Sequence, residues 1–248
     1  MDLLEKDVQD TLLVKPFNVG AHLRLSTPFI PQSNIRSCLF AISNQFGWAI
    51  IAIQSFENDQ SGPAFILTRV EKLSQSLKNA EPHVNTWITS QDAHVTIPIS
   101  TFCDPNSVFL THLAFAASDR LIVAATSDGT LSIFSLQNLI SKTNITPLRK
   151  LTAHSNIPVQ ALIPNPAPGG SFSGLIAVVY ADSTIRVLDL YDVQKVHWEA
   201  QSITAAEWSP MGKRLIVGYK DGKLEYFTHD GQSKGVIEAP AQAEGMEG

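Results

Sequence analysis

The chain has 248 residues, of which 44% are hydrophobic and 17% are charged, so it can bury a sizeable core. The net charge of −5 and an isoelectric point of about 5.8 argue against a surface dedicated to nucleic acid, and no direct nucleic-acid partner is expected. Apolar runs such as Trp48 to Ile53 are far too short to cross a membrane, which argues against membrane insertion.

The N-terminal segment MDLLEKDVQD is acidic and does not resemble a secretory signal. Two cysteines, Cys38 and Cys103, cannot form a disulfide framework, and they are expected to be reduced thiols of an intracellular protein. We therefore expect a soluble nuclear or cytoplasmic protein.

The first elements along the chain are a polar lead-in over residues 1–11 and a strand pair within residues 12–25. In propeller folds a terminal strand of this kind often completes the last blade and closes the ring. The segment CLFAISNQFGWAIIAI, which begins at Cys38, predicts a strand, a turn and a second strand. Gly47 is expected in the turn position that Gly129 and Gly222 occupy in later blades.

A short amphipathic helix is predicted within residues 68–80, because Val70, Leu73 and Leu77 recur at helical spacing. The strand VTIPI that begins at Val95 is then expected to lead into the second blade. The predicted arrangement is one blade with a long, helix-containing connection.

The most informative pattern is a phrase that occurs three times, each copy pairing an apolar strand with an alternating strand across a turn that begins with Asp. Asp-Gly between two apolar runs is a strong hairpin signal, because the turn needs residues that tolerate a positive φ. The spacing of the turns brackets the roughly 40–45-residue period of a WD40-like propeller blade. The three copies are Leu113 to Phe134 with Asp128-Gly129, Leu175 to Leu190 with Asp182-Ser183, and Ala205 to Phe227 with Asp221-Gly222.

The predicted fold is therefore all-β, a WD40-like β-propeller of which four blades are visible, over residues 12–240. The third blade contains a loop rich in proline and glycine, residues 164–174, which is expected to be a flexible surface loop. Residues 233–240 are expected to form an outer strand, and residues 241–248 a short acidic tail without order.

Two phrases resemble the propeller of the cytoplasmic-filament phenylalanine-glycine nucleoporins. LFAISNQFGWAIIA, from Leu39 to Ala52, is similar to that family's first-blade pattern L-A-V-S-N-x-x-G. ITAAEWSPMGKRLIVGYKDGKLEYF, from Ile203 to Phe227, is similar to its W-S-P-x-G-K phrase, and VIEAP, from Val236, to its exit strand. General WD40 repeats carry a similar W-S-P-x-G, so the likeness rests on the phrases taken together.

The resemblance implies part of a seven-bladed propeller on the cytoplasmic side of the nuclear pore complex. It also implies a non-catalytic scaffold in mRNA export that docks a DEAD-box RNA helicase and other nucleoporins, without a cofactor. The family's helicase-contacting loops lie mostly in later blades, so no residue of this chain inherits that role. The alternative is a generic WD40 adaptor subunit of another cytoplasmic or nuclear complex.

Basic residues of the fourth repeat are candidate partner contacts: Lys213, Arg214 and Lys220. They could pair with acidic groups of a partner, but the two ends of one strand should carry them to opposite faces of the propeller. The simpler interpretation is that these charged residues lie in turns and face solvent. Lys223 belongs to the same sequence cluster.

Phe172 and Trp198 are further candidate contacts, since aromatic side chains on loops often anchor interfaces. Trp198 has the alternative of packing under the strand that follows it. Trp208, in the W-S-P phrase, is expected to be wedged between blades.

An enzyme is not expected, because the inner strands offer mainly Ala, Val, Ile and Leu instead of convergent polar groups. His83, His94 and His112 share a region with Cys103 and Asp104, but zinc sites use tighter spacings. The glycines at 169–174 do not keep the register of G-x-S-x-G. The sequence therefore predicts no catalytic and no metal residues.

Overall fold

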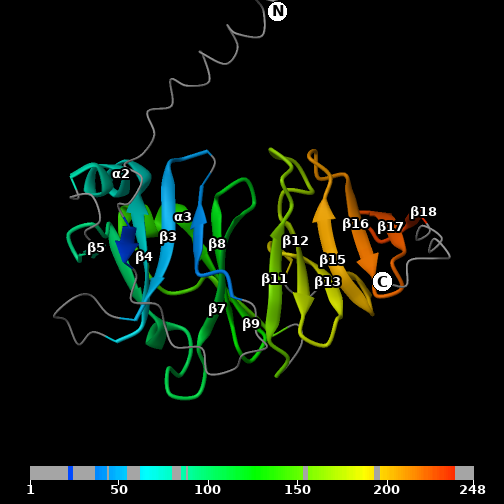
Figure 1. Cartoon of the computed structure of the whole chain (residues 1–248), viewed down its shortest axis with the longest axis horizontal. Coiled ribbons are helices and arrows are strands. Elements are labelled where there is room, and N and C mark those ends of the chain that lie inside the picture. Colours follow the sequence, from blue (N-terminus) through cyan, green and yellow to red (C-terminus); the bar gives the residue numbers. More distant parts are fainter. Residues whose placement is uncertain are drawn as a thin grey trace, which may run out of the picture.

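Four antiparallel sheets of four strands each follow one another along the chain, as a computed structural model shows (Figure 1). The structure describes residues 22–24, 37–43, 45–54, 62–79, 85–87, 89–152, 156–192 and 196–237. The predicted lead-in over residues 1–11 and the predicted tail over residues 241–248 lie outside these ranges, as does His83. Each sheet is a meander in which neighbours in sequence pair, which is the architecture of a propeller blade. The predicted all-β propeller fold is confirmed.

The blades have the following strands. Blade one consists of β2 (Phe40–Ile42), β3 (Trp48–Ile53), β4 (Ala64–Arg69) and β6 (Val95–Pro98). Blade two consists of β7 (Leu110–Ala116), β8 (Leu121–Thr126), β9 (Thr130–Ser135) and β10 (Arg149–Thr152). Blade three consists of β11 (Val159–Pro164), β12 (Leu175–Tyr180), β13 (Ile185–Asp189) and β14 (Val196–Ala200). Blade four consists of β15 (Ile203–Trp208), β16 (Arg214–Tyr219), β17 (Leu224–Thr228) and β18 (Ser233–Ile237).

Helices occupy two connections between third and fourth strands. The predicted amphipathic helix is α2 (Val70–Asn79) in blade one, and α3 (Leu136–Ser141) takes the same place in blade two. A short 3-10 helix, η1 (Ile99–Thr101), leads out of blade one. Because the strands of a meander alternate in direction, α2 and α3 lie at the same end of the blades as the turns between first and second strands. We call this end the helix face and the opposite end the Asp-turn face.

The strand from Val95 ends blade one, so the expectation that it leads into the second blade was wrong. Its backbone pairs antiparallel with β4, where Phe65 lies opposite Ile97. The segment that contains α2 separates β6 from β4 by many residues in the sequence, yet the two strands still pair. A fourth strand must satisfy the open edge of the third one, and β6 does so.

Gly47 is also in a different place from the one predicted. It joins the first and second strands of blade one with φ of +64°, and its counterpart is Gly212, with φ of +67°, between β15 and β16. Gly129 and Gly222 join second and third strands instead. The error arose because both kinds of turn end in a glycine with positive φ and carry apolar strands on both sides.

The predicted terminal strand pair is described only at β1 (His22–Arg24), which pairs in parallel with β5 (Asn85–Trp87). These strands form a separate two-stranded sheet. In the described part of the chain, β1 therefore does not add to blade four, as a ring-closing strand would.

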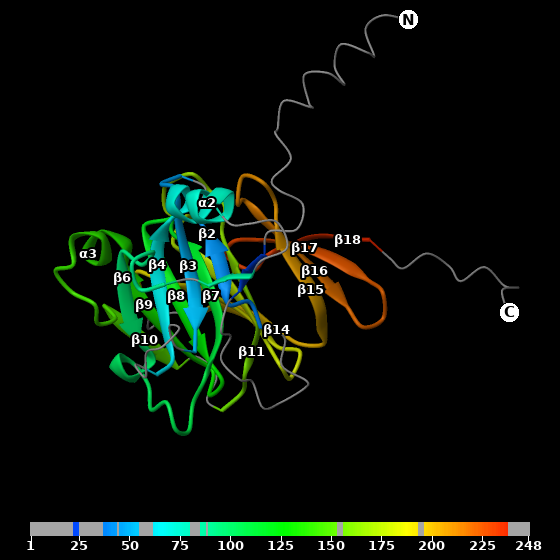
Figure 2. The same ribbon diagram turned by 60° about the vertical axis from the view of Figure 1, so that its left-hand side comes forward.

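The core lies between successive blades. Phe65 of blade one, Phe102 after η1 and Phe134 of blade two meet edge to face, with ring centroids 5.3–6.1 Å apart. Further apolar layers join blades two and three, and blades three and four. Apolar burial of this kind contributes about 1.5–3 kcal/mol for each large side chain. Figure 2 shows the sheets succeeding one another, with blade four at one end.

The far side of blade four has no neighbouring sheet among the described residues. Val123 of blade two and Ala177 of blade three are fully buried by the next blade, whereas Ile216, at the same strand position, is 44% exposed. Leu224 beside it is 41% exposed. The outward side of blade one differs, because Leu73 and Val70 of α2 pack over its buried strands.

Candidate partner-binding surfaces

A strained turn stands on the helix face between β7 and β8. Ala117, Ser118 and Asp119 all have left-handed backbones, with φ of 55°, 53° and 59°. A left-handed residue with a Cβ costs roughly 1–2 kcal/mol, so surrounding contacts must hold the turn in place. The Asp119 carboxylate accepts the Ser43 hydroxyl at 2.9 Å and the Gln45 N–H at 3.0 Å from blade one. The Ser118 hydroxyl donates to the carbonyl of Ala167 in blade three at 3.1 Å.

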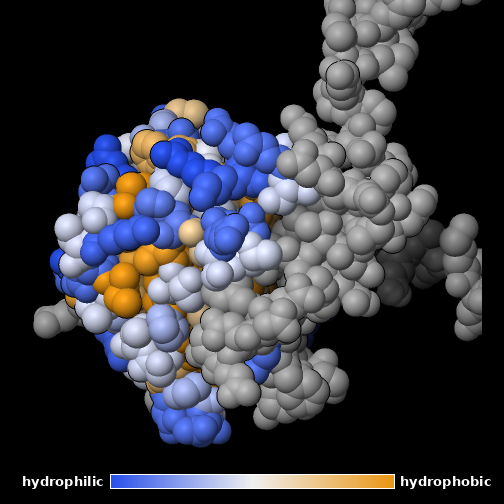
Figure 3. Space-filling view, turned by 90° about the vertical axis from the view of Figure 1, so that its left-hand side faces the viewer, coloured by the Kyte–Doolittle hydropathy of each residue, from blue (hydrophilic) through white to orange (hydrophobic). Residues whose placement is uncertain are grey.

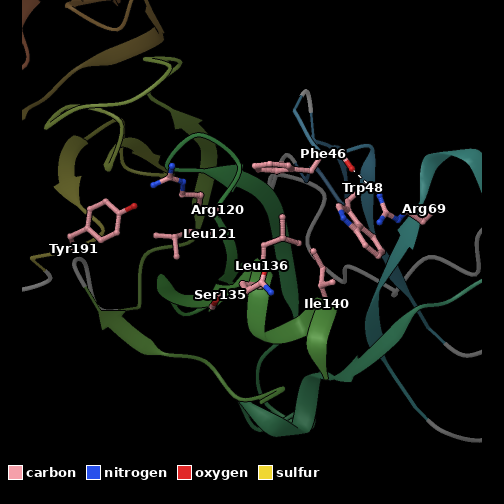
Figure 4. A pocket seen from close by; sticks show the side chains of 10 residues that line it. Phe46, Trp48, Arg69, Arg120, Leu121, Ser135, Leu136, Ile140 and Tyr191 are labelled. Carbon is pink, nitrogen blue, oxygen red and sulfur yellow. Dashed lines mark hydrogen bonds between the residues drawn. The ribbon is translucent and has the colours of Figure 1, made fainter. Parts of the chain in front are cut away.

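Beside this turn lies a cleft of about 620 Å³ that spans blades one, two and three. Tyr191 lies at one end of the cleft, and Trp48 and Arg69 lie at the other (Figure 4). The side chains that line it are Phe46, Trp48, Arg69, Arg120, Leu121, Ser135, Leu136, Gln137, Ile140 and Tyr191.

The blade-one end of the cleft is a stacked pair. The Arg69 guanidinium lies 4.0 Å from the Trp48 ring centroid and donates to the carbonyl of Phe46 at 3.2 Å. The indole also meets the His94 ring edge to face, with ring centroids 5.0 Å apart, and His94 Nε2 lies 2.7 Å from the carbonyl oxygen of Ile140. These contacts hold Arg69 in a fixed position while Phe46 stays 45% exposed.

The blade-three end of the cleft is an exposed but anchored tyrosine. Tyr191 is 51% exposed, and its backbone N–H donates to the Asp189 carboxylate at 2.8 Å. Arg149 of blade two donates to the carbonyls of Leu190, at 3.3 Å, and Tyr191. The ring lies against Gly174, where an added Cβ would come within 2.5 Å of it. The side chain is therefore held by its surroundings although half of it faces solvent.

The floor of the cleft is apolar and comes from the start of β8 and from α3. Ser135 caps α3 by accepting the N–H of Asn138 at 3.3 Å. Leu136 is buried, and Ile140 is partly buried against the same core.

The charge of the cleft is of one sign. Its ionisable lining residues are Arg69, Arg120 and Tyr191, and no carboxylate lines it. Neither guanidinium forms a salt bridge with a carboxylate within the described part of the chain. The cleft is thus basic on a chain whose net charge is −5.

The basic residues that the sequence singled out are not part of this cleft. Lys213 and Arg214 lie at the start of β16 on the helix face, and Lys220 follows the end of β16 on the Asp-turn face. A strand of that length separates its ends by about 20 Å. Arg214 lies over the Tyr226 ring at 5.5 Å, and Lys220 lines a separate hollow of about 560 Å³ between blades three and four.

The two aromatic residues predicted to contact a partner, Phe172 and Trp198, pack against other side chains of the propeller. The ring centroid of Phe172 is 4.0 Å from that of His229, and Trp198 packs on Phe227 of blade four at 4.8 Å. Both side chains are half-buried. Trp208 is 3% exposed and donates from Nε1 to the carbonyl of Ile163 at 2.9 Å, so the predicted wedge between blades is confirmed.

The loop over residues 164–174 is more ordered than the sequence indicated, and the expectation of a flexible surface loop was wrong for part of it. Asn165, Ala167 and Ser173 are buried. The Asn165 side chain donates to the carbonyl of Gly212 at 2.8 Å and accepts the Ala167 N–H at 2.9 Å. The loop fastens blade three to the W-S-P turn of blade four.

Two of the histidines, His112 and His94, each bind one backbone carbonyl. His112 is 3% exposed, and its Nε2 lies 3.0 Å from the carbonyl of Gln160, while His94 binds Ile140 as described. Burial lowers the pKa of His112 to about 4, although the Gln160 bond opposes this effect. Burial also raises the pKa of the Cys103 thiol to about 11. Among the described residues no three His, Cys, Asp or Glu side chains are grouped to hold a metal ion.

Sequence reasoning missed the cleft residues Phe46, Arg69, Arg120 and Tyr191. Phe46, Arg69 and Tyr191 lie outside the repeated Asp-turn phrase, Arg120 lies within its first copy, and the four come from three different blades. The only local signal was the sequence A-A-S-D-R before β8, which carries no glycine where the turn needs left-handed backbone.

Comparison with known proteins identifies the fold and the family. No curated protein matches the chain. A chain in the crystal structure of a mitotic checkpoint complex superposes with a TM-score of 0.58 at 13% identity over 90% of this chain, which shows a shared fold alone. This chain spans 56% of the length of that one. No helix in the described ranges is long and apolar enough to cross a membrane.

The family comparison is more specific. The NUP159/214 beta propeller family matches residues 87–248, which is more than half of the chain. Propellers of this family are structural scaffold domains of nucleoporins at the nuclear pore. The chain therefore belongs to the NUP159/214 β-propeller family.

Proposed function

We propose that this propeller is a non-enzymatic docking platform on the cytoplasmic side of the nuclear pore complex, where it holds mRNA-export factors, including a DEAD-box ATPase. The observation that carries the proposal is the family match over residues 87–248. A propeller suits such a role because rigid stacked sheets fix the turns and loops that partners contact.

The geometry supports binding rather than catalysis. The exposed side chains of the helix face include aromatic residues and arginine, which are enriched at protein interfaces. In the view of Figure 3, the described residues at the surface are largely hydrophilic, and hydrophobic side chains gather in a short strip among them.

Lys213, Arg214, Lys220, Phe172 and Trp198 remain the proposed partner contacts of this platform. The three basic residues are the most accessible of them, since all are exposed, Lys213 and Arg214 on the helix face and Lys220 on the Asp-turn face. Phe172 and Trp198 would need to act through their exposed edges, because each also packs against blade four.

The test is localisation of the tagged chain, combined with purification of its complexes. Immunogold labelling on the cytoplasmic side of the pore, together with recovery of nucleoporins and a DEAD-box ATPase, is the expected result. Recovery of a different assembly without pore components would contradict the proposal and favour a WD40 adaptor of another complex. A Lys213→Glu/Arg214→Glu variant should lose the partner, and Lys234→Glu, an exposed charge on β18, is the matched control.

A further inference from the structure

We propose that the cleft across blades one, two and three binds a short acidic peptide that places a large apolar or aromatic side chain on the cleft floor. The inference deepens the docking role proposed above and rests on it only for the source of the peptide. The recognition chemistry follows from the cleft itself.

The size and floor of the cleft suit a side chain rather than a flat surface. Its volume of about 620 Å³ is in the usual range of ligand cavities, roughly 300–1,000 Å³. The floor consists of Leu121, Leu136 and Ile140, with Phe46 and Tyr191 exposed at its margins (Figure 4). A leucine or aromatic side chain of a partner that entered over this floor would cover the rings of Phe46 and Tyr191, which now face water.

The positive charge of the cleft favours acidic residues next to the apolar side chain in the bound peptide. Arg69 and Arg120 are the cations, and the nearest carboxylate in sequence, that of Asp119, already accepts hydrogen bonds from Ser43 and Gln45. Arg69 is held in place by its stacking on Trp48, so it loses little freedom when it pairs with a carboxylate. Acidic residues on either side of an apolar anchor therefore match the cleft, whereas lysines would be repelled.

The backbone strain on the rim supports a binding role independently of the charge. Three successive left-handed residues directly precede Arg120, and contacts to blades one and three hold them in place. Backbone strain that the surroundings maintain is a common feature of ligand-binding sites. Here the strained turn fixes the position of the Arg120 backbone beside the cleft.

A peptide fits these observations better than a nucleic acid. Nucleic-acid surfaces track a run of phosphates with many basic side chains, and this cleft has two arginines on an acidic chain. An anchor side chain flanked by carboxylates uses both the apolar floor and the two arginines.

The experiment measures binding of the purified chain to a displayed library of random octapeptides, followed by fluorescence anisotropy with the enriched sequences. We expect enrichment of an aromatic residue or leucine flanked by Asp or Glu. Arg120→Gln should weaken binding about fivefold and Tyr191→Ser by a similar factor, and added salt should weaken it further. Lys234→Gln and Val196→Ser are matched controls outside the cleft, and both should bind as the parent chain does.

Several outcomes would overturn the inference. They are no enrichment of acidic sequences, binding that Arg120→Gln leaves unchanged, or tighter cleft-dependent binding of an oligouridine than of any peptide. Arg69→Lys keeps the charge but loses much of the stacking, so retained binding in that variant would show that charge alone suffices. Because the assay uses purified chain and synthetic peptides, it can succeed even if the pore localisation fails. The tagged chain can likewise localise to the pore even if the peptide assay finds no binding.

Discussion

The side-chain amide of Asn165 donates a hydrogen bond to the backbone carbonyl of Gly212 at 2.8 Å and so joins blade three to blade four. Asn165 is 3% exposed, and the same side chain accepts the N–H of Ala167. Contacts of this kind recur at each blade boundary on the helix face, where Asp119 binds Ser43 and Ser118 binds Ala167. Polar links between turns therefore fix the angles at which the sheets stack.

Gly212→Ala should destabilise the fold strongly. The added Cβ would lie 1.8 Å from Asn165 Oδ1, and the backbone there has φ of +67°. We expect a loss of about 2–4 kcal/mol in the free energy of unfolding by urea titration. Gly169→Ala, where nothing lies within 4 Å of the new methyl group, is the control and should change stability by less than about 0.5 kcal/mol. Equal losses in the two variants would contradict the interlocking role of Asn165.

Trp208→Phe and Trp198→Phe should differ, although both remove an indole. Trp208 Nε1 donates to the carbonyl of Ile163, whereas Trp198 Nε1 is buried and has no hydrogen-bond partner among the described residues. Loss of the Trp208 indole N–H removes a donor from the part-buried carbonyl of Ile163, so Trp208→Phe should cost about 1 kcal/mol more than Trp198→Phe. Thermal unfolding followed by circular dichroism would measure the difference. A larger loss in Trp198→Phe would count against this assignment.

The Asp residues of the repeated turns should contribute unequally. The Asp128 carboxylate accepts the Thr126 hydroxyl and both the N–H and the hydroxyl of Thr130. Asp221, at the same position in blade four, accepts the N–H of Lys223. Asp128→Ala should therefore lower the free energy of unfolding by about 2 kcal/mol and Asp221→Ala by about 0.5–1 kcal/mol. Chemical denaturation of the two variants side by side would reveal a reversed order.

Stability should fall as the pH is lowered through the range in which His112 titrates. Burial lowers the folded-state pKa of His112 to about 4, below the ordinary value of 6.5, so the unfolded chain binds a proton that the folded chain does not. The contribution is fully present above pH 6.5 and is lost as the pH falls toward 4, by on the order of 3 kcal/mol. Urea titrations between pH 7 and 4 should show this slope, and His112→Gln should reduce it. An unchanged slope in the variant would assign the effect to other groups.

The sequence predicted the propeller correctly because its signals are local. Each Asp turn closes with an N–H to carbonyl bond across four residues, such as Gly129 to Thr126 and Gly222 to Tyr219, and the copy in blade three uses Ser183 with φ of 67°. The strands on either side of each turn bury their side chains against the neighbouring blades. The hydrophobic pattern and the turn residues therefore predict the same hairpin. Only the second residue of each Asp pair has a positive φ, which is a smaller conformational demand than the sequence argument assumed.

Assignments that depend on distant partners could not be made in the same way. The strand from Val95 reads equally well as the end of one blade or the start of the next, and only its pairing with β4 decides between them. Likewise, the loop at 164–174 has the composition of a solvent-exposed segment, yet Asn165 finds its hydrogen-bond partner 47 positions along the chain.

The sequence by itself determined that this chain is built of antiparallel blades of a nucleoporin-like propeller, since turn residues and strand alternation act over a few neighbouring positions. Tertiary structure alone decided which side chains form the cleft. Arg69, Arg120 and Tyr191 come from different blades and meet only when the sheets stack. Their shared cleft arises from the angle between the blades. Hydrogen bonds between turns of neighbouring blades fix that angle, and their partners lie too far apart in the sequence for a local pattern to reveal them.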